Sequence, residues 1–152
     1  MKKSTRIALI AGAAAVVVAA ALVVVLVQGW GKPAFLGVSW KATAWSYNPT
    51  LDNALPMSMT VSESGGATGY LAWTGLHEYT GEATLGEGDA IEFGPPRRIG
   101  QDIQASTADL AYEQGFINIL ATMTTWEVAD GVLTLRGGFE GQDWMTFEPM
   151  DT

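Results

Sequence analysis

One hairpin decides the fold of this chain: Trp126-Glu127-Val128-Ala129-Asp130-Gly131-Val132-Leu133-Thr134-Leu135-Arg136. Aromatic and β-branched residues on both sides of Asp130-Gly131 favour extended strands. An Asp-Gly pair readily adopts the positive φ angles that a two-residue hairpin loop requires. The stretch therefore predicts two antiparallel strands, 126–129 and 132–136, joined by a tight turn.

Similar short strands, separated by glycine-rich turns, extend from this hairpin toward both ends of the chain. Residues 36–47 alternate in part, so Trp40, Ala42 and Ala44 are expected on one side of a strand. Gly94-Pro95-Pro96 predicts a loop, because proline cannot donate a backbone hydrogen bond to a sheet. The other expected strands are residues 55–61, 67–73, 82–85, 90–93 and 144–148.

The segment 106–123 is the one that shows a helical pattern. Apolar residues recur there near a period of 3.6, among them Phe116 and Leu120. Ser106 or Thr107 offers an N-cap oxygen, and Asp109 suits the first turn of a helix. Together these patterns predict an α+β domain, built as an antiparallel curved sheet or partly open barrel of about seven strands with one packed helix.

A long apolar segment precedes this domain. Residues 7–27 carry no charged or polar side chain, and 21 helical residues span about 31 Å, the thickness of the hydrocarbon core of a bilayer. Three basic residues precede the segment, which favours a cytoplasmic N-terminus. The sequence thus predicts a cytoplasmic basic tail (1–6), a single-pass transmembrane signal anchor (7–27), a linker (28–34) and an extracytoplasmic domain (35–152). The expected partner of residues 7–27 is the lipid bilayer.

Two other interpretations of residues 7–27 stay open. Ala19-Ala20-Ala21 would serve as a cleavage site for a secretory signal peptide, and the protein would then be secreted. The apolar residues 22–27 that follow favour a membrane span over cleavage, because cleavage would leave them as an exposed hydrophobic N-terminus. A buried core helix is the third interpretation, and it is disfavoured because the segment has no polar stripe.

The charge of the chain limits its partners. All 16 acidic residues follow the apolar segment, together with five of the eight basic ones, so that part carries a formal charge of −11. A field of that sign repels phosphate backbones, which excludes nucleic acid as an expected partner. The chain has no cysteine, so disulfides, thiol nucleophiles and thiolate metal sites are excluded as well.

Short motifs in a fixed order resemble the META domain family, small envelope proteins that include the HslJ-like proteins. Leu36-Gly37-Val38-Ser39-Trp40 is similar to the opening L-x-G-x-x-W of that family, and Gly75-Leu76-His77-Glu78-Tyr79-Thr80-Gly81 has the spacing of its hallmark G-C-N-x-Y-x-G. Glu113, Phe116 and Leu120 fit its helix pattern, and Leu133-Thr134-Leu135 with Met145-Thr146-Phe147 fits its closing strands. The family motifs thus fall on Trp40, Gly75, Leu76, His77, Tyr79, Gly81 and Glu113.

The resemblance implies an extracytoplasmic accessory domain connected with envelope stress, and it implies no catalytic mechanism. Leu76 stands where the family has its hallmark cysteine, and His77 stands where it has asparagine. We therefore expect Leu76 to be buried in place of the cysteine and His77 to be accessible at a turn, capping or pairing locally. Gly75 and Gly81 are expected in turn or bulge conformations that admit no side chain, and Tyr79 is expected to pack its ring under the sheet while its hydroxyl finds a polar partner.

Candidate chemistry depends on His77, the only histidine. A Ser-His-Asp arrangement would need it, but no Gly-x-Ser-x-Gly elbow is present. The acidic residues show neither the spacing of a calcium loop nor a scaffold for paired carboxylates. The sequence thus predicts no catalytic residue, no metal site and no cofactor.

A binding role is the expectation that remains. Trp45 and Tyr47 at the end of one strand, with the basic pair Arg97-Arg98, form a candidate binding patch for an envelope protein or a cell-surface ligand. The other tryptophans within strand patterns are expected to fill the core. The alternatives are a small extracytoplasmic hydrolase that uses His77, and a structural subunit of an envelope complex.

Overall fold

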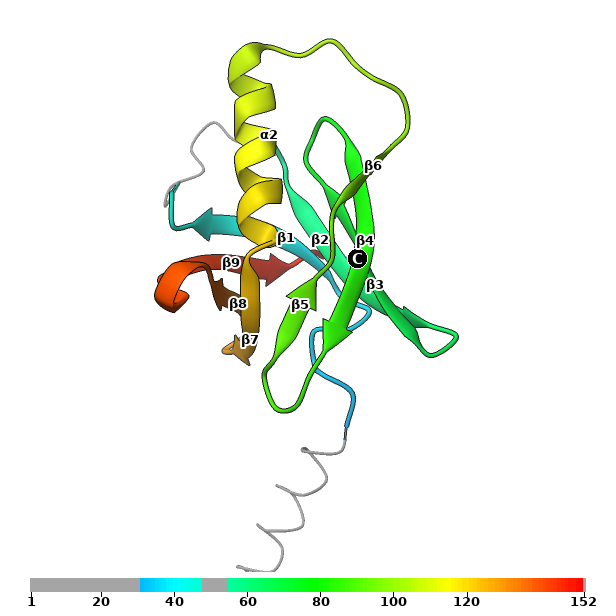
Figure 1. Ribbon diagram of the computed structural model, residues 1–152, viewed down its shortest axis with the longest axis vertical. Coiled ribbons are helices and arrows are strands. Elements are labelled where there is room, and N and C mark those ends of the chain that lie inside the picture. The colour runs from blue at the N-terminus through cyan, green and yellow to red at the C-terminus, as the bar shows by residue number, and fades with distance from the viewer. Residues whose placement is uncertain (1–30, 48–54, 152) are drawn as a thin grey trace, which may run out of the picture. The chain divides into compact units, whose positions relative to one another are not determined.

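The computed structural model describes residues 31–47 and 55–151 (Figure 1). Ala34–Thr152 form one compact unit, whose described part contains nine strands, one α-helix and a short 3-10 helix. In chain order these are β1 (Ser39–Trp45), β2 (Ser58–Ser64), β3 (Ala67–Trp73), β4 (Glu78–Leu85), β5 (Ile91–Phe93), β6 (Arg97–Ile99), α2 (Thr107–Leu120), β7 (Met123–Ala129), β8 (Val132–Gly137), η1 (Phe139–Gly141) and β9 (Asp143–Pro149).

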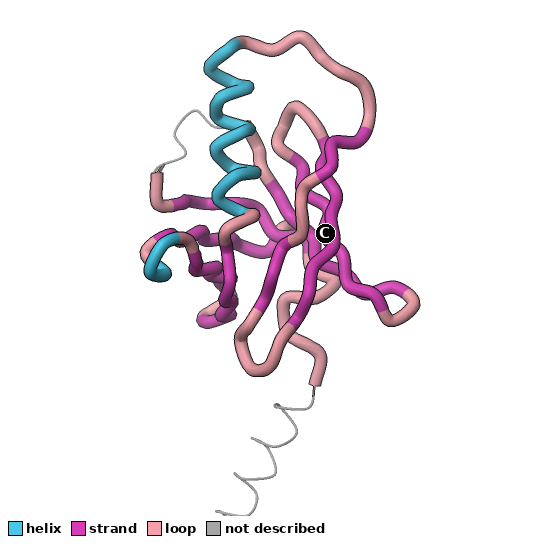
Figure 2. The backbone as a smooth tube through the Cα atoms, in the orientation of Figure 1, coloured by secondary structure: helices cyan, strands magenta, loops and turns pink. Residues whose placement is uncertain are grey.

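The strands form one antiparallel sheet that nearly closes on itself. Its order is β5-β4-β3-β2-β1-β9-β8-β7, and β6 pairs with β4 beside this path. The two end strands meet, because Ala90 bridges to Thr125 and the Trp126 N–H donates to the carbonyl of Asp89 at 2.9 Å (Figure 2). The predicted α+β class, with an antiparallel, partly open barrel and one helix, is confirmed.

The hairpin that decides the fold forms as predicted. Asp130 and Gly131 have φ angles of 51° and 77° and connect β7 to β8. Side chains alternate along the strands, so Leu133 and Leu135 of β8 point into the core while Arg136 is exposed. The largest buried side chains, which make up this core, include Phe35, Met57, Met59, Phe116, Leu120, Met123, Leu133, Leu135, Met145 and Phe147.

A β-bulge overturns the predicted orientation of β1. The register of β1 with β9 shifts between Ala42 and Ala44, and a bulge reverses the alternation of the residues that follow it. Trp45 therefore turns inward and is only 3% exposed. Its ring lies 5.0 Å from the ring of Tyr112 and 5.5 Å from that of Phe116. The prediction that Trp45 is a partly exposed binding residue is wrong.

The strand count and three tryptophans also differ from prediction. The described residues form nine strands rather than about seven, and one of them is the short strand β6, in which the chain returns to β4 after the Gly94-Pro95-Pro96 loop. Trp73, expected in the core, is 40% exposed on β3, and Trp126 and Trp144, also expected there, are only partly buried. β4 begins at Glu78, so the second half of the 75–81 motif is strand and not turn.

The helix α2 begins and ends close to the predicted bounds. Ser106 is its N-cap, and the Ser106 hydroxyl accepts a hydrogen bond from the Asp109 N–H at 3.1 Å. The buried face of α2 includes Phe116, Ile117 and Leu120, together with the acidic residue Glu113. Glu113 is the position at which the helix approaches the connection between β3 and β4.

The predicted anchor, residues 7–27, lies outside the described residues, as do residues 1–6 and residues 28–30 of the linker. In residues 31–47 and 55–151, no helix has the length and apolar character needed to cross a membrane.

Candidate functional site

The only histidine lies inside the domain. Thr74, Gly75, Leu76 and His77 form the tight connection between β3 and β4, closed by a 3.0 Å hydrogen bond from the Thr74 N–H to the His77 carbonyl. Gly75 has a φ of +84°, and a Cβ there would lie 2.8 Å from the Cβ of Leu55, so the connection needs glycine. His77 is 3% exposed, whereas Leu76 is partly exposed. The prediction of a buried Leu76 and an accessible His77 is wrong, since the turn directs them the opposite way.

Four polar side chains meet under this connection, and we call Thr74, His77, Tyr79 and Glu113 the Glu113 cluster. The His77 Nδ1 lies 3.1 Å from Oε1 and 3.0 Å from Oε2 of Glu113. The Tyr79 hydroxyl donates to Oε1 at 3.0 Å, and the Thr74 hydroxyl donates to Oε2 at 2.5 Å. His77 therefore pairs with a residue of α2, 36 positions away, and not with its own turn as predicted.

The Thr74 hydroxyl connects this cluster to the backbone. Its oxygen accepts hydrogen bonds from the N–H of His77 at 3.0 Å and of Leu76 at 3.3 Å. Its proton has two acceptors, Oε2 of Glu113 at 2.5 Å and the His77 carbonyl at 3.0 Å. The turn that holds His77 and the helix that carries Glu113 are thus joined through one side chain.

Glu113 carries the negative charge of the cluster. Burial raises the pKa of Glu113, but the hydrogen bonds from Thr74, His77 and Tyr79 together outweigh burial and leave its pKa below the usual 4.5. Burial, and then the hydrogen bond to Glu113, raise the pKa of Tyr79 to about 12. Glu113 is therefore a carboxylate at neutral pH, and the Tyr79 hydroxyl keeps the proton that it donates. The predicted polar partner of Tyr79 is confirmed.

The cluster holds α2 against the sheet. Glu113 is 4% exposed, and the Thr74 side chain lies fully inside the domain. The Nε2 atom of His77 is buried and has no hydrogen-bond partner.

In residues 31–47 and 55–151, no three histidine, aspartate or glutamate side chains gather in a way that could hold a metal ion.

The other residues of the family motifs pack around this region or in the core. Gly81 lies in β4 opposite Tyr70, where a Cβ would lie 2.5 Å from the Tyr70 ring, so the predicted absence of space for a side chain is confirmed there. Trp40 is buried, and its Nε1–H donates to the Phe35 carbonyl at 3.0 Å. Residues of the helix motif and of the hallmark motif thus lie together in the Glu113 cluster, whereas Trp40 packs in the core apart from them.

The candidate binding patch does not form one surface. Tyr47 is 79% exposed at the end of β1. Arg97 and Arg98 are exposed on β6, which is separated from β1 by the three strands β2, β3 and β4, and Arg98 forms an ion pair with Asp102. Tyr47 and the arginine pair are therefore separate features of the surface.

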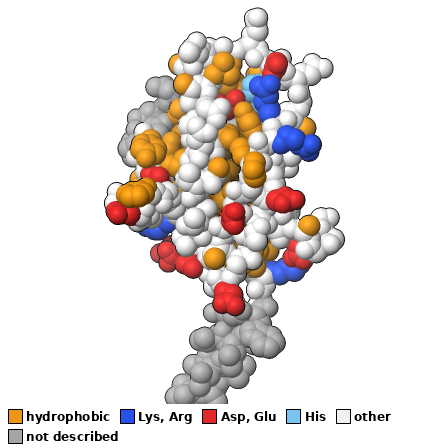
Figure 3. Space-filling model, viewed as in Figure 1, with side chains coloured by type: hydrophobic (Ala, Val, Ile, Leu, Met, Phe, Trp, Pro, Cys, Tyr) orange, Lys and Arg blue, Asp and Glu red, His pale blue; other side chains and the backbone are white. Residues whose placement is uncertain are grey.

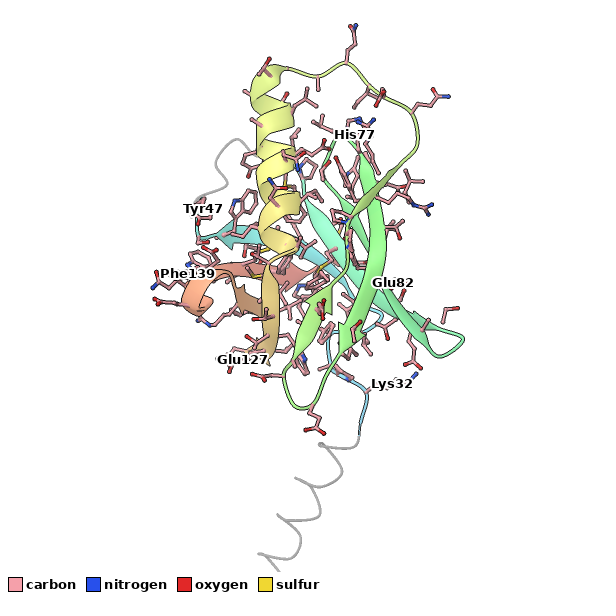
Figure 4. All side chains as sticks on the ribbon, viewed as in Figure 1. Lys32, Tyr47, His77, Glu82, Glu127 and Phe139 are labelled. Atoms are coloured by element: carbon pink, nitrogen blue, oxygen red, sulfur yellow. The ribbon has the colours of Figure 1, made fainter. Side chains whose placement is uncertain are left out.

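An exposed aromatic residue at the same edge as Tyr47 was not predicted from the sequence. Phe139 in η1 is 83% exposed, and Figure 4 shows the labelled Tyr47 and Phe139 side chains at the same edge of the domain. The signal was present, because Gly137-Gly138-Phe139-Glu140-Gly141 places a lone aromatic residue between glycines.

Comparisons with known proteins bear on the fold. Neither a family model nor a curated protein matches this chain. A protein from Burkholderia xenovorans, solved by NMR, is similar at a TM-score of 0.57 and 20% identity, over 78% of this chain and 85% of that one. A DUF4847 family protein from Bacteroides vulgatus is similar at a TM-score of 0.54 and 12% identity, over 76% of this chain and 94% of that one. These likenesses are of fold alone.

We expect His77→Ala to destabilise the protein more than Leu76→Ser. The histidine change leaves a cavity and removes a partner from a buried carboxylate, at a cost of about 2–3 kcal/mol. The serine change removes a partly exposed leucine side chain and costs less than about 1.5 kcal/mol. Melting temperatures of the two full-length variants check this, and the opposite order would show that Leu76 is the inward residue.

Proposed function

We propose that this chain is a membrane-anchored extracytoplasmic module of the META type, which binds a partner without catalysis and has an accessory or stress-associated role. The burial of His77 in the Glu113 cluster is the observation that carries the proposal. A general base must reach the proton that it abstracts, whereas this histidine is 3% exposed and connects a turn to a helix. Its role in packing supports a stable binding scaffold.

The family resemblance gains support from where its motifs lie. His77 and Tyr79 lie in one segment of the sequence, and both contact Glu113, which lies in a distant one. These motif positions therefore have one structural role in common, which is to join the turn after β3 to the helix α2. The proposal of META type depends on this convergence together with the order of the motifs along the chain.

Fractionation of cells that produce the full-length chain with a C-terminal epitope tests the anchoring. We expect the tag in the membrane fraction and accessible to protease added outside the cytoplasmic membrane. Deletion of residues 1–30 should release the domain from the membrane. A full-length chain that stays in the soluble fraction of the cytoplasm would contradict the proposal.

One observation favours a hydrolase as the second candidate. The His77 Nδ1 is held by a carboxylate while Nε2 lacks a partner, and in a catalytic triad the base is oriented in this way. A broad panel of ester and glycoside substrates, tested with the wild type and with His77→Gln, separates the two candidates. We expect no turnover that depends on His77, and turnover lost in His77→Gln while the protein stays folded would establish the hydrolase.

A further inference from the structure

The exposed aromatic residues Tyr47 and Phe139 lie at the same edge of the domain, on two segments that both approach the carboxylate of Asp143 (Figure 4). On one segment, the hydroxyl of Ser46, the residue before Tyr47, donates to Oδ1 of Asp143 at 3.2 Å, and Asp143 raises the pKa of Tyr47. On the other segment, a Cβ on Gly138 would overlap Oδ2 of Asp143, so the turn that carries Phe139 packs directly against the same group. We call Tyr47, Phe139, Glu140 and Asp143 the aromatic rim.

The aromatic rim is held by defined contacts. The Ser46 hydroxyl donates to Oδ1 of Asp143 at 3.2 Å, and the Ser46 N–H donates to the Trp144 carbonyl at 3.0 Å. These bonds hold the end of β1 beside the start of β9. Ser46, the residue before Tyr47, is thus held next to Asp143 by the sheet itself.

The turn before β9 adopts an uncommon conformation that presents Phe139 to solvent. Gly138 has a φ of 71°, and Glu140, which is not glycine, has a φ of 54°. Left-handed backbone at a non-glycine residue is strained, and such strain concentrates where a surface is used. Because Phe139 is 83% exposed, the strain is not offset by packing of its ring in the core.

The negative charge of the aromatic rim favours a cationic ligand. Neither Glu140 nor Asp143 lies in an ion pair in the part of the chain that the structure describes; Glu140 accepts from the Gln142 side chain at 3.3 Å. In the space-filling view, hydrophobic and acidic side chains lie together at this edge of the domain (Figure 3). The rest of the domain reinforces this sign, since the sequence after residue 27 carries a charge of −11. A guanidinium or ammonium group gains both from the carboxylates and from the faces of aromatic rings.

We propose that the aromatic rim is a docking site for a basic peptide segment of a partner protein, which inserts an arginine or lysine side chain between Tyr47 and Phe139 against Asp143. The proposal rests on the proposed function and names the surface and the partner chemistry that serve it. Arginine suits the site better than lysine, because its planar guanidinium stacks on aromatic faces and donates to a carboxylate at the same time. A neutral oligosaccharide would also stack on aromatic rings, but it would gain nothing from the negative charges of Glu140 and Asp143.

Titration of the full-length chain in detergent micelles with a labelled, capped Gly-Arg-Gly-Arg-Gly peptide tests the site. The matched probe replaces both arginines with citrulline, which keeps the shape and removes the charge. We expect binding of the arginine peptide that weakens with salt, and no measurable binding of the citrulline peptide. Equal binding of both peptides, or binding of maltohexaose without binding of the arginine peptide, would overturn the proposal.

Variants that keep the charge separate the aromatic rim from the general negative field. We expect Phe139→Ala to weaken binding about fivefold and the double change Tyr47→Ala with Phe139→Ala about tenfold or more. Phe139→Leu should weaken binding like Phe139→Ala, because it keeps apolar area and removes the π face. Ile103→Ala, at an apolar residue that is 47% exposed elsewhere, is the control and should bind like the wild type.

Unchanged affinity in Phe139→Ala and in the double variant would show that the peptide binds the diffuse charge of the domain, and the aromatic rim would then be rejected. Because Phe139 is exposed, these variants should keep the wild-type melting temperature. Failure of the peptide titration leaves the fractionation and His77→Gln results untouched, so the docking site and the proposed function fail separately.

Discussion

Replacing Glu113 with glutamine should lower the free energy of unfolding by about 3 kcal/mol. The carboxylate accepts hydrogen bonds at both oxygens from three side chains, of Thr74, His77 and Tyr79. Glutamine has one acceptor oxygen and presents an NH₂ group to donors, so at least one buried donor loses its partner. Removing one partner of a buried charged network costs this much because the others stay in the interior. Denaturant unfolding of the full-length chain measures the change.

The control is Glu127→Gln, the same chemical change at an exposed position of β7, which should change stability by less than about 0.5 kcal/mol. A Glu113→Gln protein as stable as this control would show that α2 is held by apolar packing alone.

Acid should reduce the difference between wild type and Glu113→Gln. The pKa of Glu113 in the folded protein lies below the usual 4.5, so the unfolded chain takes up a proton first as pH falls. The contribution of Glu113 to stability is then complete above about pH 4.5 and is lost as pH falls through the folded pKa. Unfolding free energies of the two proteins should therefore converge in acid, and a constant difference would contradict the role of the ionised carboxylate.

Replacing Gly137 with alanine should cost about 3 kcal/mol. A Cβ at this position, the last of β8, would overlap the Thr122 carbonyl oxygen and lie 2.6 Å from the Cα of Met123. Both obstacles are backbone atoms, which cannot turn away as a flexible side chain can, so β7 and β8 would have to separate. The same Thr122 carbonyl accepts the Gly138 N–H at 3.0 Å, and this bond would be disturbed too.

The matched change is Gly115→Ala in α2, where a Cβ meets nothing within 4 Å. Alanine there should stabilise the protein by about 0.5–1 kcal/mol, because glycine loses more backbone freedom in a helix. Thermal unfolding of both variants beside the wild type measures the pair. If Gly137→Ala were neutral, the strands β7 and β8 would not approach as closely as described.

Elements set by neighbouring residues were predictable from the sequence. Asp130-Gly131 determined a turn of positive φ, and Ser106 with Asp109 determined the start of α2, because turn and cap preferences act over a few residues. Alternation of apolar residues placed most strands within a few positions. The antiparallel, barrel-like architecture was also predictable, because several amphipathic strands must bury one face together.

The residues of the Glu113 cluster could be predicted only in part from the sequence. The sequence pointed to His77, Tyr79 and Glu113 as motif positions, but not to their contact, because the pairing of β3 with β4 and the placement of α2 bring them together across more than 30 residues. The nearby Gly75 favours a turn, and local preference therefore predicts His77 as an exposed turn residue. Only the tertiary structure supplies the carboxylate that makes its burial favourable.

The sequence alone determined a strand-rich domain with one helix, and it determined the strongly acidic charge that follows the apolar segment. The tertiary structure decided which side chains face inward and which meet. The bulge after Ala42 buried Trp45, and the strained turn at Glu140 left Phe139 in solvent beside Tyr47 and Asp143. Both outcomes depend on strand register and on close contact between distant backbones, and these are set by the closed sheet as a whole rather than by the residues on either side.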